Sequence, residues 1–446
     1  MTLYLDRKKF SEKSKDELLD ELEKKYDELN QKDEELERLK KELRKYKNPN
    51  TPPSANQHLK PDAQPLKRKR KRGAPVGHPG TTRAFKEPDE ERFITQDECP
   101  NGHSNLTVTG IETRIIEELP ADIQTKNIRV TRQHLHCNDC GVDFIARDGR
   151  TPVQGRFGVN VMVFVIFLKF IVRGVLRKTA SFLETGFAFK VTPATVNVII
   201  SRAAQAAEAE YVSLQQKIRS ARIVYADETS FSVLGVKWWV WVFRTDTDVL
   251  LVIRHSRGNK VLEEVLGKQF SGVIVCDCWR AYDYLSNASI QRCWAHLLRK
   301  SKELESLPGR RFHHKLALLF ERIERFNARP RTKEQRSRKY EQLTKSLREL
   351  TVYYSHYAEC EAVAKYVDFH VESWFTCVRF EGVEATNNFA EQAIRETVIV
   401  RKIIGAFRSE RGTKVYETLA SLLATWQFQK LDVSKELYRM LSAGLC

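Results

Sequence analysis

The sequence has no stretch of about 20 apolar residues, the length that a helix needs to cross a bilayer. Its most apolar run, Val159 to Val172, is shorter and contains Lys169, and therefore predicts a buried helix of a soluble protein. The first 22 residues are charged throughout and lack the apolar segment of a secretory signal. Nine cysteines in 446 residues do not make a disulfide scaffold. We therefore expect a cytoplasmic protein without a membrane partner.

Acidic residues are outnumbered by basic ones. The 75 lysines and arginines exceed the 58 acids and give a net charge of +17, which predicts a polyanionic partner. Six of these cations are consecutive: Lys67, Arg68, Lys69, Arg70, Lys71 and Arg72. Because like charges repel in a compact state, we expect this run to be disordered until phosphates neutralise it. A solubility feature is the alternative, but DNA binding is the simpler interpretation.

Leucine recurs at every seventh position from Leu22 to Leu43, which is typical of one seam of a coiled coil. The companion positions are half polar, since Asp33 and Lys40 stand among them. The segment therefore predicts either a weak dimer or a single solvated helix. Pro49 ends the helix, and a linker rich in proline, asparagine and glutamine follows.

Two short motifs have the spacing of zinc ligands. Cys99 and His103 form a C-x3-H turn, and Cys137 and Cys140 form a later C-x2-C turn. Four such ligands would hold a structural Zn²⁺ tetrahedrally, in a β module similar to a zinc ribbon. His134 and His136 are rival ligands, and free thiols that merely pack are the alternative to zinc.

The pattern from 157 to 219 is helical. It predicts a short helix, a break at Gly186 and a second helix opened by Thr192 and Pro193. This arrangement fits a helix-turn-helix for a DNA major groove and equally fits an ordinary helical hairpin.

From Ala221 the apolar residues alternate. The segments 221–234, 237–245 and 248–258 predict three successive strands, in which Trp238, Trp239 and Trp241 are core residues first. The run "SGVIVCDCWRAY" predicts a buried strand, "QRCWAHLLRK" begins a helix, and the residues from Arg310 to Phe380 are mostly helical. The pattern describes an α/β fold with a mixed sheet covered by helices.

Three acids in this region lie in unusual places. Asp227 interrupts an apolar strand, Asp277 follows the buried strand, and Glu391 opens a cationic helix. A charge in or next to a buried strand is unfavourable without compensation. Each aspartate could cap a strand, and Glu391 could pair with Arg395 on a solvated face. Together, however, three carboxylates would bind hard divalent cations such as Mg²⁺ or Mn²⁺, as two-metal phosphodiester chemistry requires.

Several motifs in order, "YADETS", "CDCWRAY", "QRCWAHLLRK" and "TNNFAEQAIRETVIVRKIIGAFRSERG", resemble the core of DDE transposases of the insertion-sequence-66 type. The linker motifs "NPNTPPSANQ" and "GAPVGHPGTTR" resemble that family as well. The resemblance implies an RNase H-like catalytic domain in which Asp227, Asp277 and Glu391 hold the metal ions. It implies that Arg395, Arg401 and Lys402 meet the DNA backbone and that His296 lies near the active site or the DNA. A second cysteine would be more usual than His103.

Some alternatives stay open. Glu384 and, less strongly, Glu228 are rivals for the third acid. A metal site could instead be built from the cysteines and histidine of "CDCW" and "CWAH", namely Cys276, Cys278, Cys293 and His296.

The expected domains are a coiled-coil helix (1–48), a basic linker (49–90), a zinc module (91–150), a helical region (151–219), an RNase H-like domain (220–408) with a helical insertion at about 305–380, and a C-terminal helical segment (409–446). The expected partners are the terminal inverted repeats of an insertion sequence, target DNA, a second copy or more of the chain, and accessory proteins of the same element. A zinc-containing DNA-binding regulator without catalysis and a structure-specific RNase H-like nuclease are the competing functions.

Overall fold

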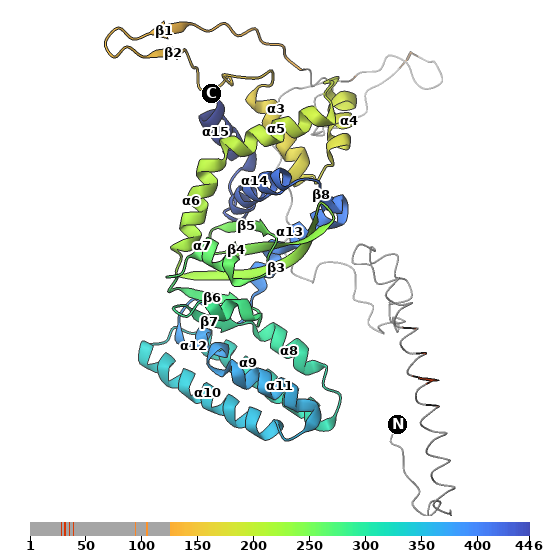
Figure 1. Cartoon of the computed structure of the whole chain (residues 1–446), viewed down its shortest axis with the longest axis vertical. Coiled ribbons are helices and arrows are strands. Elements are labelled where there is room, and N and C mark those ends of the chain that lie inside the picture. The colour runs from red at the N-terminus through yellow and green to blue at the C-terminus, as the bar shows by residue number, and fades with distance from the viewer. Residues whose placement is uncertain are drawn as a thin grey trace, which may run out of the picture. The chain divides into compact units, whose positions relative to one another are not determined.

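The computed structural model describes residues 125–446 and eight isolated positions before them. The chain divides into two units, Met1–Gln124 and Thr125–Cys446, and the second is described here (Figure 1). The basic run, Cys99 and His103 lie outside the described residues. Of the expected coiled coil, the structure describes five helical positions: Glu28, Gln31, Lys32, Glu35 and Leu39. None of the described helices has both the length and the apolarity needed to cross a membrane.

A mixed sheet forms the middle of this unit (Figure 1). Its strand order is β5-β4-β3-β6-β7, and β8 pairs with the far end of β3. The bounds are β3 Ile223–Val233, β4 Val236–Arg244, β5 Val249–Arg254, β6 Val273–Cys276, β7 Ser289–Arg292 and β8 Ala406–Phe407. β3, β4 and β5 pair antiparallel, whereas β6, β7 and β8 join in parallel. The three expected meandering strands and the buried fourth strand are confirmed.

The helix expected from Gln291 begins later than predicted. Gln291 and Arg292 are fully buried residues of β7, and α8 runs over Trp294–Lys302. The Gln291 amide bonds the backbone of Cys377 and Trp374, and the Arg292 guanidinium donates to the Asp277 carbonyl at 2.6 Å. These partners are distant in sequence and satisfy the hydrogen-bonding groups of Gln291 and Arg292 inside the sheet. The prediction of a helix from Gln291 rested on the local sequence, which does not contain these partners.

Both faces of the sheet are covered. Val224 and Ala226 of β3 face one core, which helices α3, α5, α6, α7, α14 and α15 complete. Tyr225 faces a second core, shared with helices of the insertion and with α13. The bounds are α3 Val159–Ile166, α4 Leu176–Phe187, α5 Pro193–Ala206, α6 Glu208–Arg219, α7 Asn259–Leu266, α13 Asn388–Ile404, α14 Glu410–Phe428 and α15 Val433–Leu445.

The apolar run at Val159 forms α3 and then a π-helical turn, Phe167–Ile171. The expected break at Gly186 is wrong, because α4 continues to Phe187 and the left-handed residue is Ala188, with φ 49°. The expected start of the next helix is confirmed. Thr192 accepts a hydrogen bond from the Thr195 N–H, and Pro193 occupies the first turn of α5.

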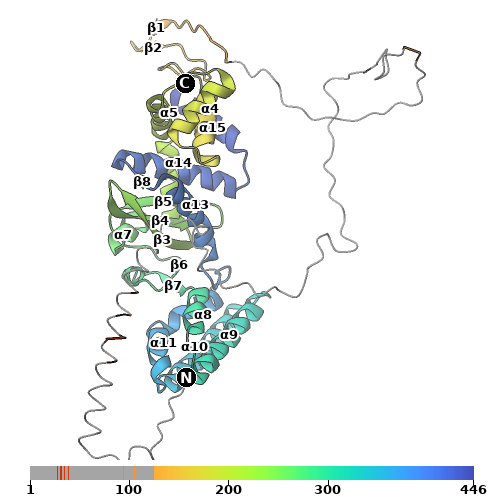
Figure 2. The same cartoon turned by 90° about the vertical axis from the view of Figure 1, so that its right-hand side faces the viewer.

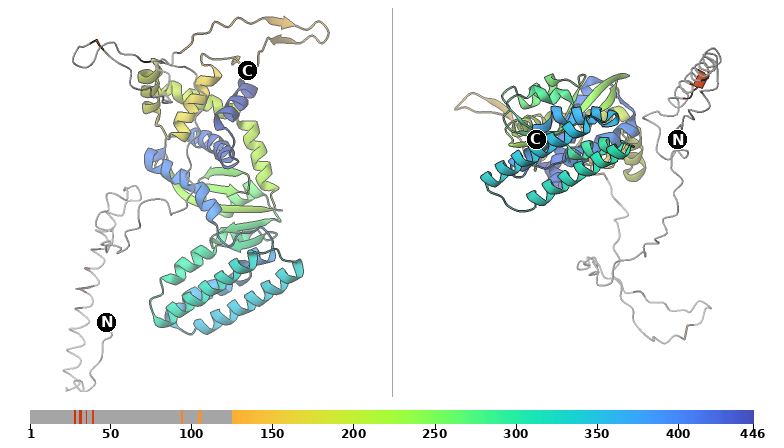
Figure 3. Two further views of the ribbon diagram at one scale, coloured as in Figure 1. Left: turned by 180° about the vertical axis from the view of Figure 1, so that it is seen from behind. Right: turned by 90° about the horizontal axis from the view of Figure 1, so that it is seen from below.

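The residues between α8 and α13 are helical, as expected. They form α9 Leu307–Asn327, α10 Lys333–Tyr354, α11 Ala358–Phe369 and the short α12 Thr376–Arg379. These helices and α3–α5 lie at opposite ends of the sheet (Figures 1, 2 and 3).

Candidate active site

The two aspartates reach the same level of the sheet. β3 pairs with β6 in parallel from Ile223 opposite Val273 to Tyr225 opposite Val275, an offset of 50 residues. The same offset separates Asp227 from Asp277. Neighbouring strands lie about 4.8 Å apart, and residues two apart on a strand share a face. The register therefore places Asp227 and Asp277 at the same level, where the paired part of β3 and β6 ends.

The Asp227 carboxylate is crowded by other acids. Its Oδ1 accepts one hydrogen bond, from the Glu228 N–H at 2.9 Å. Burial raises the pKa of Asp227 to about 7, and the negative charges of Glu228, Asp277 and Glu391 contribute to the increase. Because charges interact strongly only at short range in a protein, Asp227, Asp277 and Glu391 belong to one electrostatic cluster.

Glu391 comes to this cluster through the start of α13. The helix begins after Asn387, whose side-chain amide donates to the Ala226 carbonyl at 2.7 Å, next to Asp227. Asn387 does not cap the helix with its side chain, because that side chain binds β3 instead. This hydrogen bond holds the first turn of α13 next to the part of β3 that carries Asp227.

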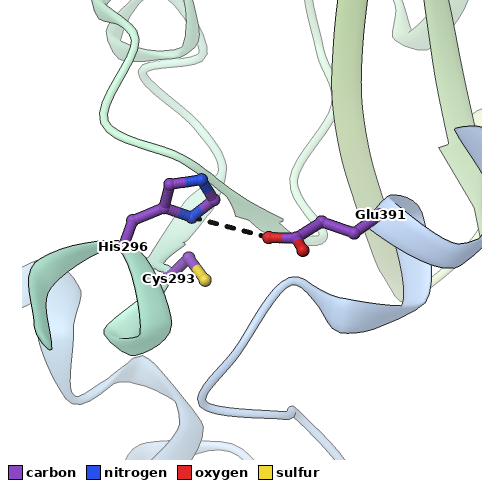
Figure 4. A group of neighbouring side chains, drawn as sticks. All are labelled: Cys293, His296 and Glu391. Carbon is purple, nitrogen blue, oxygen red and sulfur yellow. Dashed lines mark ion pairs between the residues drawn. The ribbon is translucent and has the colours of Figure 1, made fainter. Parts of the chain in front are cut away.

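The Glu391 carboxylate lies close to His296 rather than to Arg395, its alternative partner. The His296 imidazole lies in ion-pair range, with Nδ1 3.8 Å from Oε1 (Figure 4). Both of these atoms are buried and have no hydrogen-bond partner among the described residues. A solvated Glu391–Arg395 pair is therefore not what the structure contains.

The acid cluster fits a hard divalent cation. Among the described residues, the oxygens of the three carboxylates do not all lie within 4.8 Å of one another. The charges of Asp277 and Glu391 nevertheless act on the buried Asp227, and Glu391 Oε1 is buried without a hydrogen-bond partner among the described residues. A bound cation would compensate both, and carboxylate oxygens are the ligands that Mg²⁺ and Mn²⁺ prefer. Asp227, Asp277 and Glu391 are the residues that could hold it.

The two rival acids have different surroundings. Glu228 is buried and accepts hydrogen bonds from Arg257 Nε and from the Tyr282 hydroxyl, each at 2.8 Å. These two bonds lie on the side of β3 opposite Asp227, but burial and the negative charge of Asp277 still raise the pKa of Glu228. Glu384 is exposed and stands before α13 begins.

The predicted DNA-contacting cations of α13 fall into two groups. Arg395 and Lys402 are exposed. Arg401 is half-buried and donates to the Thr229 hydroxyl at 3.1 Å and to the Ser230 carbonyl. A DNA contact remains a prediction for all three, and Arg401 already binds β3 through Nη1.

Sequence reasoning missed an aromatic and cationic group beside Asp277. The Trp279 N–H donates to Asp277 Oδ1 at 2.9 Å, and the Arg257 guanidinium lies 4.1 Å from the Trp279 ring centre. A pocket of about 400 Å³ opens between these residues and Tyr284. The tryptophan stands inside the motif "CDCWRAY", but Arg257 becomes its neighbour only through the fold.

The second predicted zinc motif forms a turn between β1 His134–His136 and β2 Asp143–Ile145. The Gly141 N–H donates to the Cys137 carbonyl at 2.8 Å, and hydrogen bonds from the Cys140 backbone and thiol lower the pKa of Cys137. A lowered thiol pKa favours metal binding. Both rival histidines are exposed, and His136 Nδ1 lies 2.8 Å from Asp143 Oδ1.

The four-residue alternative does not assemble as a single site. Cys293 and His296 form a group with Glu391 whose ligand atoms lie within 4.8 Å of one another. The Cys276 sulfur lies 3.6 Å from Arg292 Nη1 instead.

A family model described as "Transposase IS66 family" matches residues 154–415. The match covers more than half of the chain, and it includes the whole sheet, the helical insertion and α13. No curated protein matches the chain.

Proposed function

The chain belongs to the IS66 family of transposases, and from this premise we propose that it binds the terminal inverted repeats of an insertion sequence and transfers the cut ends to target DNA. Water would cleave the element's end, and the freed 3′-hydroxyl would then attack a target phosphodiester. DNA is the partner that the family implies, and the excess of 75 basic over 58 acidic residues supports it.

The observation that carries the proposal is the common 50-residue offset of the β3–β6 register and of Asp227 from Asp277. It supports an RNase H-like catalytic domain, with Asp227 on β3, Asp277 directly after β6 and Glu391 in α13. Bound Mg²⁺ or Mn²⁺ would supply Lewis acidity on both sides of the scissile phosphorus. Asp227, Asp277 and Glu391 would hold the ions, while Arg395 and Lys402 would position the phosphate backbone.

The remaining segments would recognise and assemble the DNA ends. We assign recognition of the DNA ends to the basic linker (49–90), the zinc module (91–150) and the helical region (151–219). Within the helical region, α5 would enter a major groove. The coiled coil (1–48) would help to form a dimer or larger assembly. Residues 220–408 would be the catalytic domain, interrupted by the insertion at 305–380 and followed by the helical segment 409–446. Accessory proteins of the same element would act with a cytoplasmic, nucleoid-associated enzyme.

A strand-transfer assay with Mg²⁺ or Mn²⁺ tests the catalytic role of the acids. We expect Asp277→Asn to lower the rate roughly 10³-fold, because loss of a metal ligand removes several kcal/mol of transition-state stabilisation. The exposed Glu384→Gln is the matched control and should keep wild-type activity. Full activity of Asp277→Asn would refute the proposed chemistry.

The same assay separates the competing functions. Tight DNA binding by the wild type without any cleavage would indicate a zinc-containing regulator. Cleavage without joined products would indicate a structure-specific nuclease of the same fold.

A further inference from the structure

A second group of metal-binding atoms lies beside the proposed acid cluster and shares one residue with it. The Cys293 sulfur, an imidazole nitrogen of His296 and a carboxylate oxygen of Glu391 all lie within 4.8 Å of one another (Figure 4). Within the described part of the chain, these three residues form the one group of this kind.

Two helix starts bring the three side chains together. Cys293 precedes the first residue of α8 and His296 lies in its first turn, whereas Glu391 lies in the first turn of α13. Two hydrogen bonds join these starts: the Asn387 N–H donates to the Cys293 sulfur at 3.2 Å, and the Trp294 N–H donates to the Ala385 carbonyl at 3.0 Å. The protein backbone therefore holds the three residues next to one another without help from a ligand.

The donor types select a cation other than Mg²⁺. A thiolate, an imidazole and a carboxylate form a mixed set that suits Zn²⁺, whereas Mg²⁺ prefers oxygen alone. Tetrahedral zinc would place a nitrogen and an oxygen donor about 3.3–3.5 Å apart, and His296 Nδ1 lies 3.8 Å from Glu391 Oε1, so a small movement of either side chain would complete the geometry. Both atoms are buried and have no hydrogen-bond partner among the described residues, so a cation between them would satisfy two polar groups.

We propose that Cys293, His296 and Glu391 form a binding site for Zn²⁺, separate from the zinc module predicted around Cys137 and Cys140. Formation of the Zn–S bond releases the thiol proton to solvent, and water completes the coordination. Since Glu391 is also the proposed third ligand of the catalytic ions, zinc would withdraw it from the acid cluster and inhibit DNA cleavage. Binding follows from the geometry alone, and inhibition rests on the proposed function as well.

The first experiment counts zinc ions bound by the full-length chain. We expect Cys293→Ser and His296→Gln each to bind one equivalent of zinc less than the wild type. With Co²⁺ in place of zinc, Cys293→Ser should show weaker thiolate charge-transfer absorption than the wild type. Cys360→Ser is the matched control, because Cys360 is another buried thiol, within α11. Wild-type stoichiometry in both variants would overturn the site. His296 is one-third exposed, so His296→Gln decides the question if the cysteine variant does not fold.

The second experiment measures zinc inhibition of Mg²⁺-supported strand transfer, with each variant compared with its own zinc-free rate. The zinc concentration for half-inhibition should rise about 10-fold or more in Cys293→Ser, and should stay at the wild-type value in Cys360→Ser. If the wild type binds the additional zinc without inhibition, the metal site stands and the proposed catalytic role of Glu391 is wrong. Equal inhibition of Cys293→Ser and the wild type overturns the shared-ligand mechanism.

Discussion

Asp227 and Glu228 are adjacent acids on one strand with opposite environments. Glu228 lies on the side where Arg257 and Tyr282 provide hydrogen bonds. Asp227 lies on the other side, where its neighbours include the further carboxylates Asp277 and Glu391. Alternation along the strand separates their hydrogen-bond partners, whereas burial and neighbouring carboxylates raise the pKa of both acids. A buried acid that the protein compensates is structural, whereas one left uncompensated is a candidate for metal binding.

Asp227 should therefore make the metal-free protein less stable as the pH rises. Its pKa is about 7 in the folded chain, against an ordinary value of 3.8. Between these values the folded state holds a proton that the unfolded state has lost, so the free energy of unfolding falls with increasing pH. We expect metal-free Asp227→Asn to be more stable than the wild type at pH 8, by on the order of 2 kcal/mol after allowance for solvent screening.

Urea unfolding at several pH values measures this difference. The advantage of Asp227→Asn should shrink toward pH 4 and should also diminish when Mg²⁺ is added to the wild type at pH 8. Glu384→Gln serves as the control because Glu384 is exposed. A constant difference between Asp227→Asn and the wild type across this pH range would contradict the assignment.

Helix α14 protects an edge of the sheet. β5 is the last strand on its side, and its backbone N–H groups would otherwise lack partners. Thr425, Ser421 and Glu417 accept hydrogen bonds from the N–H groups of β5 at 2.8–3.0 Å. Such an edge is otherwise a template for pairing with another chain. The segment after 408, expected as a separate C-terminal piece, thus packs directly on the sheet.

Replacement of one of these acceptors should destabilise the fold. In Ser421→Ala the buried Leu251 N–H would lose its acceptor, and we expect a loss of about 1–3 kcal/mol in the free energy of unfolding. Chemical denaturation would measure it. Ser213→Ala changes an exposed serine of α6 and should leave stability within about 0.5 kcal/mol of the wild type. Equal stability of the two variants would argue against the edge-protecting role of α14.

At the scale of the whole molecule, charge should control how the protein associates with DNA. The net charge of +17 includes six consecutive cations at 67–72, and contacts to phosphates release counterions in proportion to their number. Such contacts provide affinity without reading base sequence. Discrimination of the element's ends must therefore come from other segments of the chain.

Replacing all six residues from Lys67 to Arg72 with glutamine should weaken binding to inverted-repeat and unrelated DNA by similar factors. The slope of log affinity against log salt should become shallower by up to about 5, since each phosphate contact contributes about 0.9. Fluorescence anisotropy at several salt concentrations would measure both effects. A selective loss of inverted-repeat binding, with the salt slope unchanged, would show that the run reads sequence.

Local patterns in the sequence were sufficient for much of this fold. Alternation identified β3, because a half-buried strand repeats every two residues, whereas β5 is a short continuous apolar run buried on both faces. Thr192 and Pro193 identified the start of α5, since capping depends on adjacent residues. The separated acid motifs led to the family that the comparison found.

Other features were decided by the tertiary structure. β7 has polar residues at buried positions and pairs with β6, whereas β8 has two residues and exists through pairing with the distant β3. The side chain of Asn387 binds β3 rather than its own helix. Cys293 and Glu391 stand 98 residues apart, and their proximity depends on the insertion folding as one body between them. Sequence periodicity reports which face of an element is buried, whereas only packing of distant elements determines which side chains meet.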